Sequence, residues 1–295
     1  MRIVAVIMLF LLEVDCNRKS GAQQSAIEFT VPVKVIVSGY NGNMMEPFIS
    51  RDGNTLLFNN LNAAPENTNL HWATRMNDST FEYKGEVTGV NTTDLEGVPS
   101  LDQAGELYFV STRNYVTTLS TIYQSEFANG IATNVRLVEG LSKMQAGWLT
   151  FDVEVSADGS TLYFVDGLFN QSGTPTTADL AIAKKNGSGF QRISNSNSLL
   201  QNVNTNALEY AACISVDQLE LYFTRVETPI TASSSPAIFL ARRQSVDEPF
   251  GVPFKIESIR GFAEAATIAP DQKTIYFHMK ENDKFGLYMI RKKLP

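Results

Sequence analysis

One short pattern recurs five times along this chain, and the repeat restricts the possible folds more than any other feature. Each copy has a short apolar run, a turn containing Asp, and a second run rich in aromatic residues; the third copy, residues 151–164, reads FDVEVSADGSTLYF. This pattern predicts a β-hairpin. The copies recur about every 55 residues, a period that indicates a repeat architecture. The copies can be aligned on the residue that lies two positions before the turn Asp. These residues are Ser50, Ser100, Ser156, Ser215 and Ala269.

Each hairpin is followed by further short segments with the composition of β-strands. The third segments are residues 69–75, 121–125, 179–185, 237–243 and 286–292, and more polar fourth segments follow, as at residues 81–84 and 254–257. Units of four short strands, with no room for a long helix, are typical of β-propeller blades. We therefore predict an all-β fold, a five-bladed β-propeller with four-stranded blades.

The last repeat reaches the end of the sequence after its third strand, and the N-terminal region supplies a candidate for the fourth. Residues 29–35 read FTVPVKV and match residues 250–256, FGVPFKI, which precede the fifth hairpin. Pairing of this N-terminal strand with the last blade would leave no long unpaired edge. We predict that the propeller is closed in this way.

The N-terminus has the pattern of an export signal. Residues 3–12 are uninterruptedly apolar, too short to span a bilayer but of the right length for a signal-peptide core. Cys16 lies where lipoproteins carry a lipidated Cys, and Ala22 offers an ordinary cleavage site; both alternatives stay open. We expect residues 1–22 to be a signal peptide, or a lipoprotein signal ending before Cys16, and residues 23–295 to form one propeller domain. The expected location is the periplasm, the outer membrane through a lipid anchor at Cys16, or the extracellular space.

Composition excludes several classes of function. The formal net charge is −7 and no long basic run occurs, so a nucleic-acid partner is not expected. With two His and two Cys in the sequence, we expect no metal and no cofactor. Cys213 lies in an apolar run and is predicted to be a buried core residue without a disulfide. The protein is expected to be a monomer.

The hairpins resemble the TolB-like, WD40-like propeller repeat of exported bacterial proteins. That motif has an acidic residue, a short strand ending in Ser, an Asp-Gly turn and an aromatic strand, as in EPFISRDGNTLLF from Glu46 and DVEVSADGSTLYF from Asp152. The resemblance covers residues 29–295 and implies the fold, whereas it leaves the function open. Gln replaces the turn Gly at Gln103, Gln218 and Gln272. There we expect a different turn geometry, because a non-Gly residue at positive φ is disfavoured.

Acidic residues recur where the innermost strands are expected to begin. Loops at that end of a propeller form its usual binding face, so we expect these carboxylates to converge at the mouth of the central channel. Their repulsion must be offset there by water, a cation or basic groups. Three acids occupy equivalent places and two lie one or two residues earlier in their copies: Glu46, Glu96 and Asp152, then Glu209 and Glu264.

Other candidate ligand-binding residues lie near the same face. Arg113, Arg225 and Lys280 follow the aromatic strands, His278 follows the fifth, and Trp148 precedes the third innermost strand. The basic residues either pair with the acids and stabilise the blades, or leave some acids free in an open pocket.

Two functional hypotheses follow. The favoured one is a non-enzymatic binding or scaffold protein that recognises an envelope protein or a glycan at this face. The alternative is a glycoside hydrolase, because that reaction needs two carboxyl groups on either side of the glycosidic bond. In that case Glu46, Glu96 and Asp152 are the predicted catalytic residues.

Overall fold

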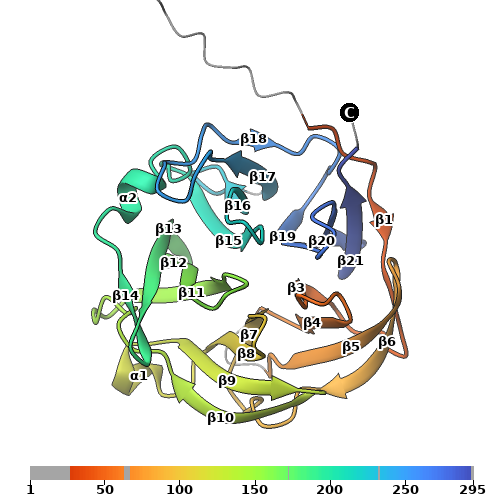
Figure 1. Ribbon diagram of the computed structural model, residues 1–295, viewed down its shortest axis with the longest axis horizontal. Helices are drawn as coiled ribbons and strands as arrows, with labels where there is room; N and C mark the ends of the chain where they lie inside the picture. The colour runs from red at the N-terminus through yellow and green to blue at the C-terminus, as the bar shows by residue number, and fades with distance from the viewer. Residues whose placement is uncertain (1–26, 63–66, 172, 232, 294–295) are drawn as a thin grey trace, which may run out of the picture.

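The computed structural model describes residues 27–62, 67–171, 173–231 and 233–293, and these residues form an all-β structure. The predicted signal segment, with Cys16 and Ala22, lies outside them. The strands surround a common centre (Figure 1). The two helices of the described residues are single turns, α1 (Tyr115–Thr118) and α2 (Ser196–Leu199). No helix in this part of the chain is long and apolar enough to cross a membrane.

The strands follow the repeat as five consecutive antiparallel groups, numbered here as the first to fifth strand group. The first group contains β3 (Met45–Ile49), β4 (Thr55–Asn59), β5 (Leu70–Asn77) and β6 (Thr80–Glu86), and the second contains β7 (Glu96–Leu101), β8 (Glu106–Ser111), β9 (Ile122–Ala128) and β10 (Ile131–Leu137). The third contains β11 (Trp148–Val155), β12 (Thr161–Phe169), β13 (Pro175–Asn186) and β14 (Gly189–Arg192). The fourth contains β15 (Leu208–Ile214), β16 (Glu220–Val226), β17 (Ala237–Arg242) and β18 (Phe254–Lys255). A parallel bridge between Ala178 and Leu208 connects the third and fourth groups into one hydrogen-bonded sheet.

The fifth group combines both ends of the described chain. It contains β19 (Ala263–Ile268), β20 (Thr274–Glu281), β21 (Lys284–Arg291) and, on its outer edge, β1 (Val33–Lys34) from the N-terminal region. Val33 pairs with Met289, and Phe29 forms a further bridge to Lys292. The next strand, β2 (Ile36–Ser38), pairs in parallel with β6 of the first group. The N-terminal segment therefore connects the last strand group to the first, as Figure 1 shows.

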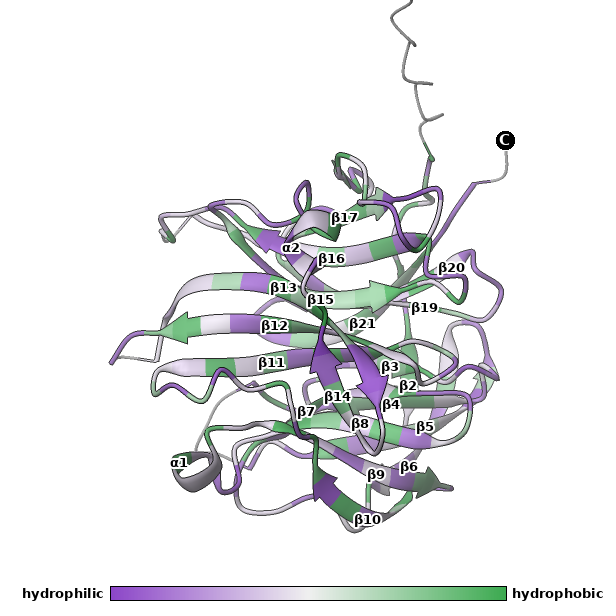
Figure 2. Cartoon of the chain, turned by 60° about the vertical axis from the view of Figure 1, so that its left-hand side comes forward, coloured by the Kyte–Doolittle hydropathy of each residue, from purple (hydrophilic) through white to green (hydrophobic). Residues whose placement is uncertain are grey.

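The core lies between neighbouring strand groups. Hydrophobic residues concentrate in inner strands such as β15, while the outer strand β14 is largely hydrophilic (Figure 2). In each group, one position of the second strand that pairs with the innermost strand carries a fully buried side chain. This residue is Leu57 in the first group and an aromatic residue in the other four. The aromatic residues are Tyr108, Tyr163, Tyr222 and Tyr276. This repeated burial explains why the motif requires an aromatic run after each turn.

Every innermost strand contains a β-bulge, and at its centre one residue adopts a left-handed conformation. These residues are Glu46, Val98, Asp152, Ala211 and Ala265, with φ between 48° and 55°. Bulges bend a strand and redirect its side chains. The equivalence corrects the predicted alignment of the second copy, in which Val98, and not Glu96, occupies the place of Glu46. The cause is that the turn of the second hairpin is shorter. A hydrogen bond from the Asp102 N–H to the Glu106 carbonyl closes it.

The turn prediction is wrong for two of the three Gln residues. Gln218 and Gln272 have φ of 59° and 56°, in the same left-handed region as Gly53. Left-handed backbone costs a non-Gly residue about 1–2 kcal/mol. The Gln272 side chain offsets part of this cost by donating to the Ala269 carbonyl oxygen at 3.1 Å. In the second hairpin the left-handed position is Gly105, with φ of 92°.

Side chains on one strand group accept main-chain N–H groups of the next, and these interactions hold the groups together. Asn59 Oδ1 accepts from the Val98 N–H at 3.0 Å, and Thr224 Oγ1 accepts from the Ala265 N–H at 3.1 Å. Cys213 is buried, as predicted, and its Sγ accepts from the Ile268 N–H. Further acceptors of this kind are Ser100 for Val155, Glu154 for Ile214 and Thr267 for Ile49. We call these side chains inter-group anchors.

Removing an anchor is expected to leave a buried N–H without an acceptor. Asn59 is fully buried, so Asn59→Ala is expected to lower the free energy of unfolding by about 1–3 kcal/mol. The exposed Asn186, whose side chain donates to Gln191, provides the control: Asn186→Ala should cost less than about 0.5 kcal/mol. Chemical denaturation measures both. Equal midpoints for the two variants would contradict the anchor role.

Candidate functional site

The structure divides the five predicted acids into two classes, and the first class is fully engaged in structural contacts. Glu96 accepts hydrogen bonds from the Thr92 N–H at 2.7 Å and from Ser111 Oγ at 2.7 Å. Its Oε1 also lies 3.1 Å from Nη2 of Arg113. Glu96 is completely buried. It therefore holds the loop before β7 and is not available to a ligand.

Glu209 repeats this arrangement in the fourth strand group. Its carboxylate accepts from the Thr205 N–H at 3.0 Å and Oγ1 at 2.6 Å, and from Arg225 Nε at 2.7 Å. Like Glu96, it is completely buried and follows a Thr by four residues. The two predicted arginines thus neutralise two predicted acids within their own strand groups.

The second class consists of Glu46, Asp152 and Glu264, which lie on the first, third and fifth innermost strands. Their exposed fractions are 6%, 7% and 9%, and no Arg or Lys of the described residues forms an ion pair with them. His278 on β20 and Tyr210 on β15 contact this set directly. We call these five residues the axial cluster. It contains three carboxyl groups that no Arg or Lys in the described ranges neutralises.

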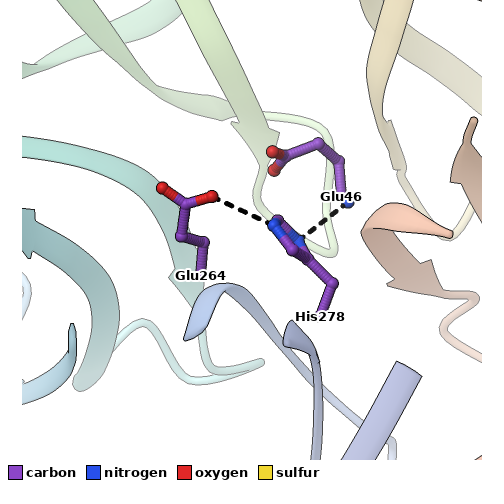
Figure 3. Close-up of side chains that lie close together, drawn as sticks. All are labelled: Glu46, Glu264 and His278. Atoms are coloured by element: carbon purple, nitrogen blue, oxygen red, sulfur yellow. Dashed lines mark hydrogen bonds and ion pairs between the residues drawn. The ribbon is translucent and has the colours of Figure 1, made fainter. Parts of the chain in front are cut away.

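Hydrogen bonds fix the orientation of His278 within the axial cluster. Its Nδ1 accepts from the main-chain N–H of Glu46 at 3.2 Å, and its Nε2 lies 3.0 Å from Oε2 of Glu264 (Figure 3). Because Nδ1 accepts a hydrogen bond, the ring proton is on Nε2, which donates to Glu264. The Tyr210 hydroxyl donates to Oε1 of the same carboxylate. Glu264 is therefore held by two donors.

Burial shifts the protonation of the other two acids. Burial raises the pKa of Asp152 well above its usual range, and the charge of Glu46 raises it further, while the Ala211 N–H at 2.9 Å opposes this. Burial also raises the pKa of Glu46, against the effect of His278. Both shifts favour the neutral acids. The axial cluster thus reduces its negative charge by retaining protons.

A metal ion is the other way to balance such a cluster, and the donor geometry argues against it. One ligand atom each from Glu46, Glu264 and His278 lies within 4.8 Å of the others. If Nε2 of His278 bound a metal ion, the ring proton would be on Nδ1. The Nδ1–H group would then face the main-chain N–H of Glu46, which in this structure donates to Nδ1. The hydrogen bonds of His278 therefore fit a proton better than a metal ion.

A small cavity lies on the axis next to the axial cluster. Its volume is about 20 Å³, and Glu46, Glu154 and Thr267 supply its polar lining. This is room for about one water molecule. Toward the hairpin turns, Arg51 Nη2 donates to Glu154 Oε1 at 3.1 Å and to the Val155 carbonyl at 2.6 Å. This buried ion pair joins the first and third strand groups.

The remaining predicted residues lie apart from the axial cluster. Trp148 is the first residue of β11. Lys143 Nζ lies over the Trp148 ring, 3.3 Å from the ring centroid, and the Trp148 main-chain carbonyl accepts a hydrogen bond from the Tyr115 hydroxyl. Lys280 pairs with the exposed Asp283 at 3.1 Å. From the sequence, Tyr210 is an aromatic residue before the fourth innermost strand, expected to pack between blades or to contact a ligand; in the structure its hydroxyl donates to Glu264. It directly precedes the left-handed position of the fourth copy, where Glu264 stands in the fifth.

Comparison with known proteins identifies the fold. No known family and no curated protein matches the sequence. A solved glycoside hydrolase matches with a TM-score of 0.59 at 12% identity over 91% of this chain and 93% of that one. A thermostable family-43 glycoside hydrolase matches with a TM-score of 0.57 at 10% identity over 89% and 96%. These similarities support a β-propeller fold.

TolB from Acinetobacter baumannii also matches, with a TM-score of 0.46 at 13% identity over 85% of this chain and 55% of that one. The predicted membership of the TolB-like family stays a prediction.

Proposed function

We propose that the protein is a carbohydrate-active propeller, a glycoside hydrolase that uses the carboxyl groups of the axial cluster. One observation carries the proposal: three buried carboxyl groups meet on the axis without an Arg or Lys partner in the described part of the chain. Structural carboxylates elsewhere in this chain, such as Glu96 and Glu209, have such a partner. The axial acids therefore have an environment suited to proton transfer.

Asp152 is the proposed general acid. Glycoside hydrolysis needs one carboxyl group that is protonated at the working pH and gives its proton to the leaving-group oxygen. The raised pKa of Asp152, caused first by burial and then by the charge of Glu46, supplies this property. The charge of Glu264 acts on Asp152 in the same direction.

Glu264 is the proposed second carboxylate, acting as base or nucleophile. It accepts hydrogen bonds from His278 Nε2 at 3.0 Å and from the Tyr210 hydroxyl. These two donors fix the orientation of the carboxyl group. The cluster thus combines an acid that retains its proton with a second carboxyl group of fixed orientation, and the reaction requires two such groups.

The solved glycoside hydrolases named above support this proposal through the fold alone, because their identity to this chain is 10–12%. We further propose that the fold is a five-bladed propeller of the TolB-like type, closed by the N-terminal strand. Its support is the repeat itself, the pairing of β1 with β21, and the contact of Glu46 with His278 between the first and fifth groups. Export through residues 1–22, either with a lipid anchor at Cys16 or with cleavage after Ala22, belongs to the same proposal.

A second candidate function is a binding module for an envelope protein or a glycan. The observation that favours it is the small size of the cavity beside Glu46, whose volume is about 20 Å³. A sugar ring is larger than a single water molecule, so a hydrolase requires the face above the cluster to open. A binding module can instead use the surrounding loops and leave the cluster closed.

The decisive experiment is a screen for hydrolysis of plant and bacterial polysaccharides, comparing wild type with Asp152→Asn and Glu264→Gln. Removing a general acid or base typically lowers the rate by 10²–10⁴-fold. The exposed Glu126, which contacts Asn134, gives the control Glu126→Gln with an expected rate equal to wild type. Hydrolysis that persists in both cluster variants would contradict the assigned roles. Binding of a glycan without its hydrolysis would favour the binding module.

The same variant has a predicted effect on stability. The pKa of Asp152 is raised in the folded state, so the folded protein binds this proton more tightly than the unfolded chain and loses stability as pH rises through that pKa. Asn keeps an oxygen that can accept from the Ala211 N–H. Asp152→Asn is therefore expected to be at least as stable as wild type at pH 8 by thermal denaturation, so that a loss of activity cannot be attributed to unfolding.

A further inference from the structure

His278 occupies a position that recurs in all five strand groups. In each group, the residue just before the left-handed position of the innermost strand pairs with a residue of the second strand. In the fifth group these two residues are Glu264 and His278. The equivalent residues in the first to fourth groups are Asn59, Val110, Val165 and Thr224. Where this residue is polar, it accepts the bulge N–H of the next strand group. His278 is thus the inter-group anchor between the fifth and first groups.

His278 differs from the other anchors because it has a second polar atom aimed at the axial cluster. Asn59 and Thr224 each accept the next group's N–H, and neither contacts an acidic side chain. His278 accepts the Glu46 N–H through Nδ1 and contacts Glu264 through Nε2 (Figure 3). Anchoring alone does not need a histidine, since Asn and Thr perform it elsewhere in this chain. The additional group therefore indicates an additional role.

We propose that His278 is a positioning residue of the axial site: the main-chain N–H of Glu46 fixes it in the Nε2–H tautomer, so that Nε2 donates to Oε2 of Glu264 and fixes the orientation of that carboxyl group. The inference rests on the proposed function, since Glu264 is the carboxylate assigned there. The tautomer follows from the contact between the fifth and first strand groups, because the donor is a main-chain group that has no alternative protonation state.

The environment of His278 is consistent with this role. The ring is completely buried, and the side chain of Phe285 packs against it edge-on at 5.5 Å between centroids. Burial lowers the pKa of His278, whereas the hydrogen bond to Glu264 and the charges of Glu46 and Glu264 raise it above its ordinary value overall. The neutral ring and the imidazolium both carry a proton on Nε2, so both donate to Glu264. The imidazolium also carries a proton on Nδ1, which removes the acceptor of the Glu46 N–H, so this contact favours the neutral ring.

The first test is the tautomer itself, which does not require enzymatic activity. With two histidines in the sequence, ¹⁵N NMR of labelled protein gives two imidazole patterns, and the variant His71→Gln assigns them. At pH 9 the expected pattern of His278 is neutral with the proton on Nε2. A proton on Nδ1 at this pH would overturn the inference, whatever the outcome of the polysaccharide screen.

The second test separates anchoring from positioning. His278→Asn restores the side chain that anchors the next group at Asn59, so its unfolding midpoint is expected to stay within a few degrees of wild type, whereas His278→Ala loses the anchor and is less stable. In both variants Glu264 loses a donor. The chemical shift of its side-chain carboxyl carbon, read by ¹³C NMR of labelled Glu with Glu264→Gln for assignment, is therefore expected to differ from that of wild type.

If hydrolysis is found, its rate is expected to fall in His278→Asn while the unfolding midpoint stays near that of wild type. An unchanged carboxyl chemical shift of Glu264 in His278→Asn would show that His278 is only an anchor. That result would leave the hydrolase proposal standing. The reverse combination, a changed carboxyl shift of Glu264 without any hydrolysis, would remove the proposed function while retaining the positioning role.

Discussion

Deletion of residues 23–38 is expected to abolish cooperative folding or to lower the free energy of unfolding by most of its value. The segment supplies Phe29, Val35 and Val37, whose exposed fractions are 8%, 1% and 4%. Burial of a side chain of this kind contributes about 1.5–3 kcal/mol, so the three together contribute about 5–9 kcal/mol. That amount is comparable to the total stability of a typical domain, about 5–15 kcal/mol.

Point substitutions in the same segment give a matched comparison that leaves the chain length unchanged. Val35→Asp places a charge in the core and is expected to cost several kcal/mol. Val33, two residues away, is 46% exposed, and Val33→Asp should have a small effect. Urea denaturation followed by tryptophan fluorescence measures both. A deletion variant as stable as the full chain, or equal midpoints for the two point variants, would show that this segment is not needed for the stability of the fold.

Disruption of the ion pair across the axis is the second large expected effect. The side chains of Arg51 and Glu154 are 8% and 5% exposed, and Glu154 also accepts from Ser100 Oγ at 2.7 Å. Glu154→Ala leaves the Arg51 charge buried without its carboxylate. Such a change typically costs about 3–5 kcal/mol.

The double variant Arg51→Met with Glu154→Leu removes both charges and provides the control. Replacement of a buried ion pair by apolar residues of similar volume is often neutral or stabilising, so the double variant should recover much of the stability lost in Glu154→Ala. Thermal unfolding of the three proteins measures the difference. A Glu154→Ala protein as stable as wild type would show that water or a rearranged Arg51 already satisfies this site.

The local architecture could be predicted from the sequence because each hairpin is encoded within about 14 residues, by an apolar run, turn residues and an aromatic run. The expected strands are present in all five copies, including the third strands β5, β9, β13, β17 and β21. The second copy was misaligned by two residues. Its turn is shorter, and Gly105, two residues beyond Gln103, supplies the left-handed position.

The predicted acids lie in or next to the innermost strands, and the structure divides them into two classes that the sequence did not separate. Glu96 and Glu209 differ from the axial acids because a Thr four residues earlier and an Arg on the neighbouring strand fold back onto them. The Thr-x-x-x-Glu spacing was visible in the sequence at residues 92–96 and 205–209. It identifies the two structural acids only once the loop conformation is known.

The sequence by itself determined the strands and the repeat, because these depend on residues close together in the chain. The tertiary structure alone decided which acids share the axis and which have a basic partner. It brings His278 to Glu46, 232 residues away in sequence, and Arg51 to Glu154, 103 residues away. Such contacts depend on how the five strand groups pack around one centre, and both the low dielectric and the fixed donors that shift proton affinities arise from that packing.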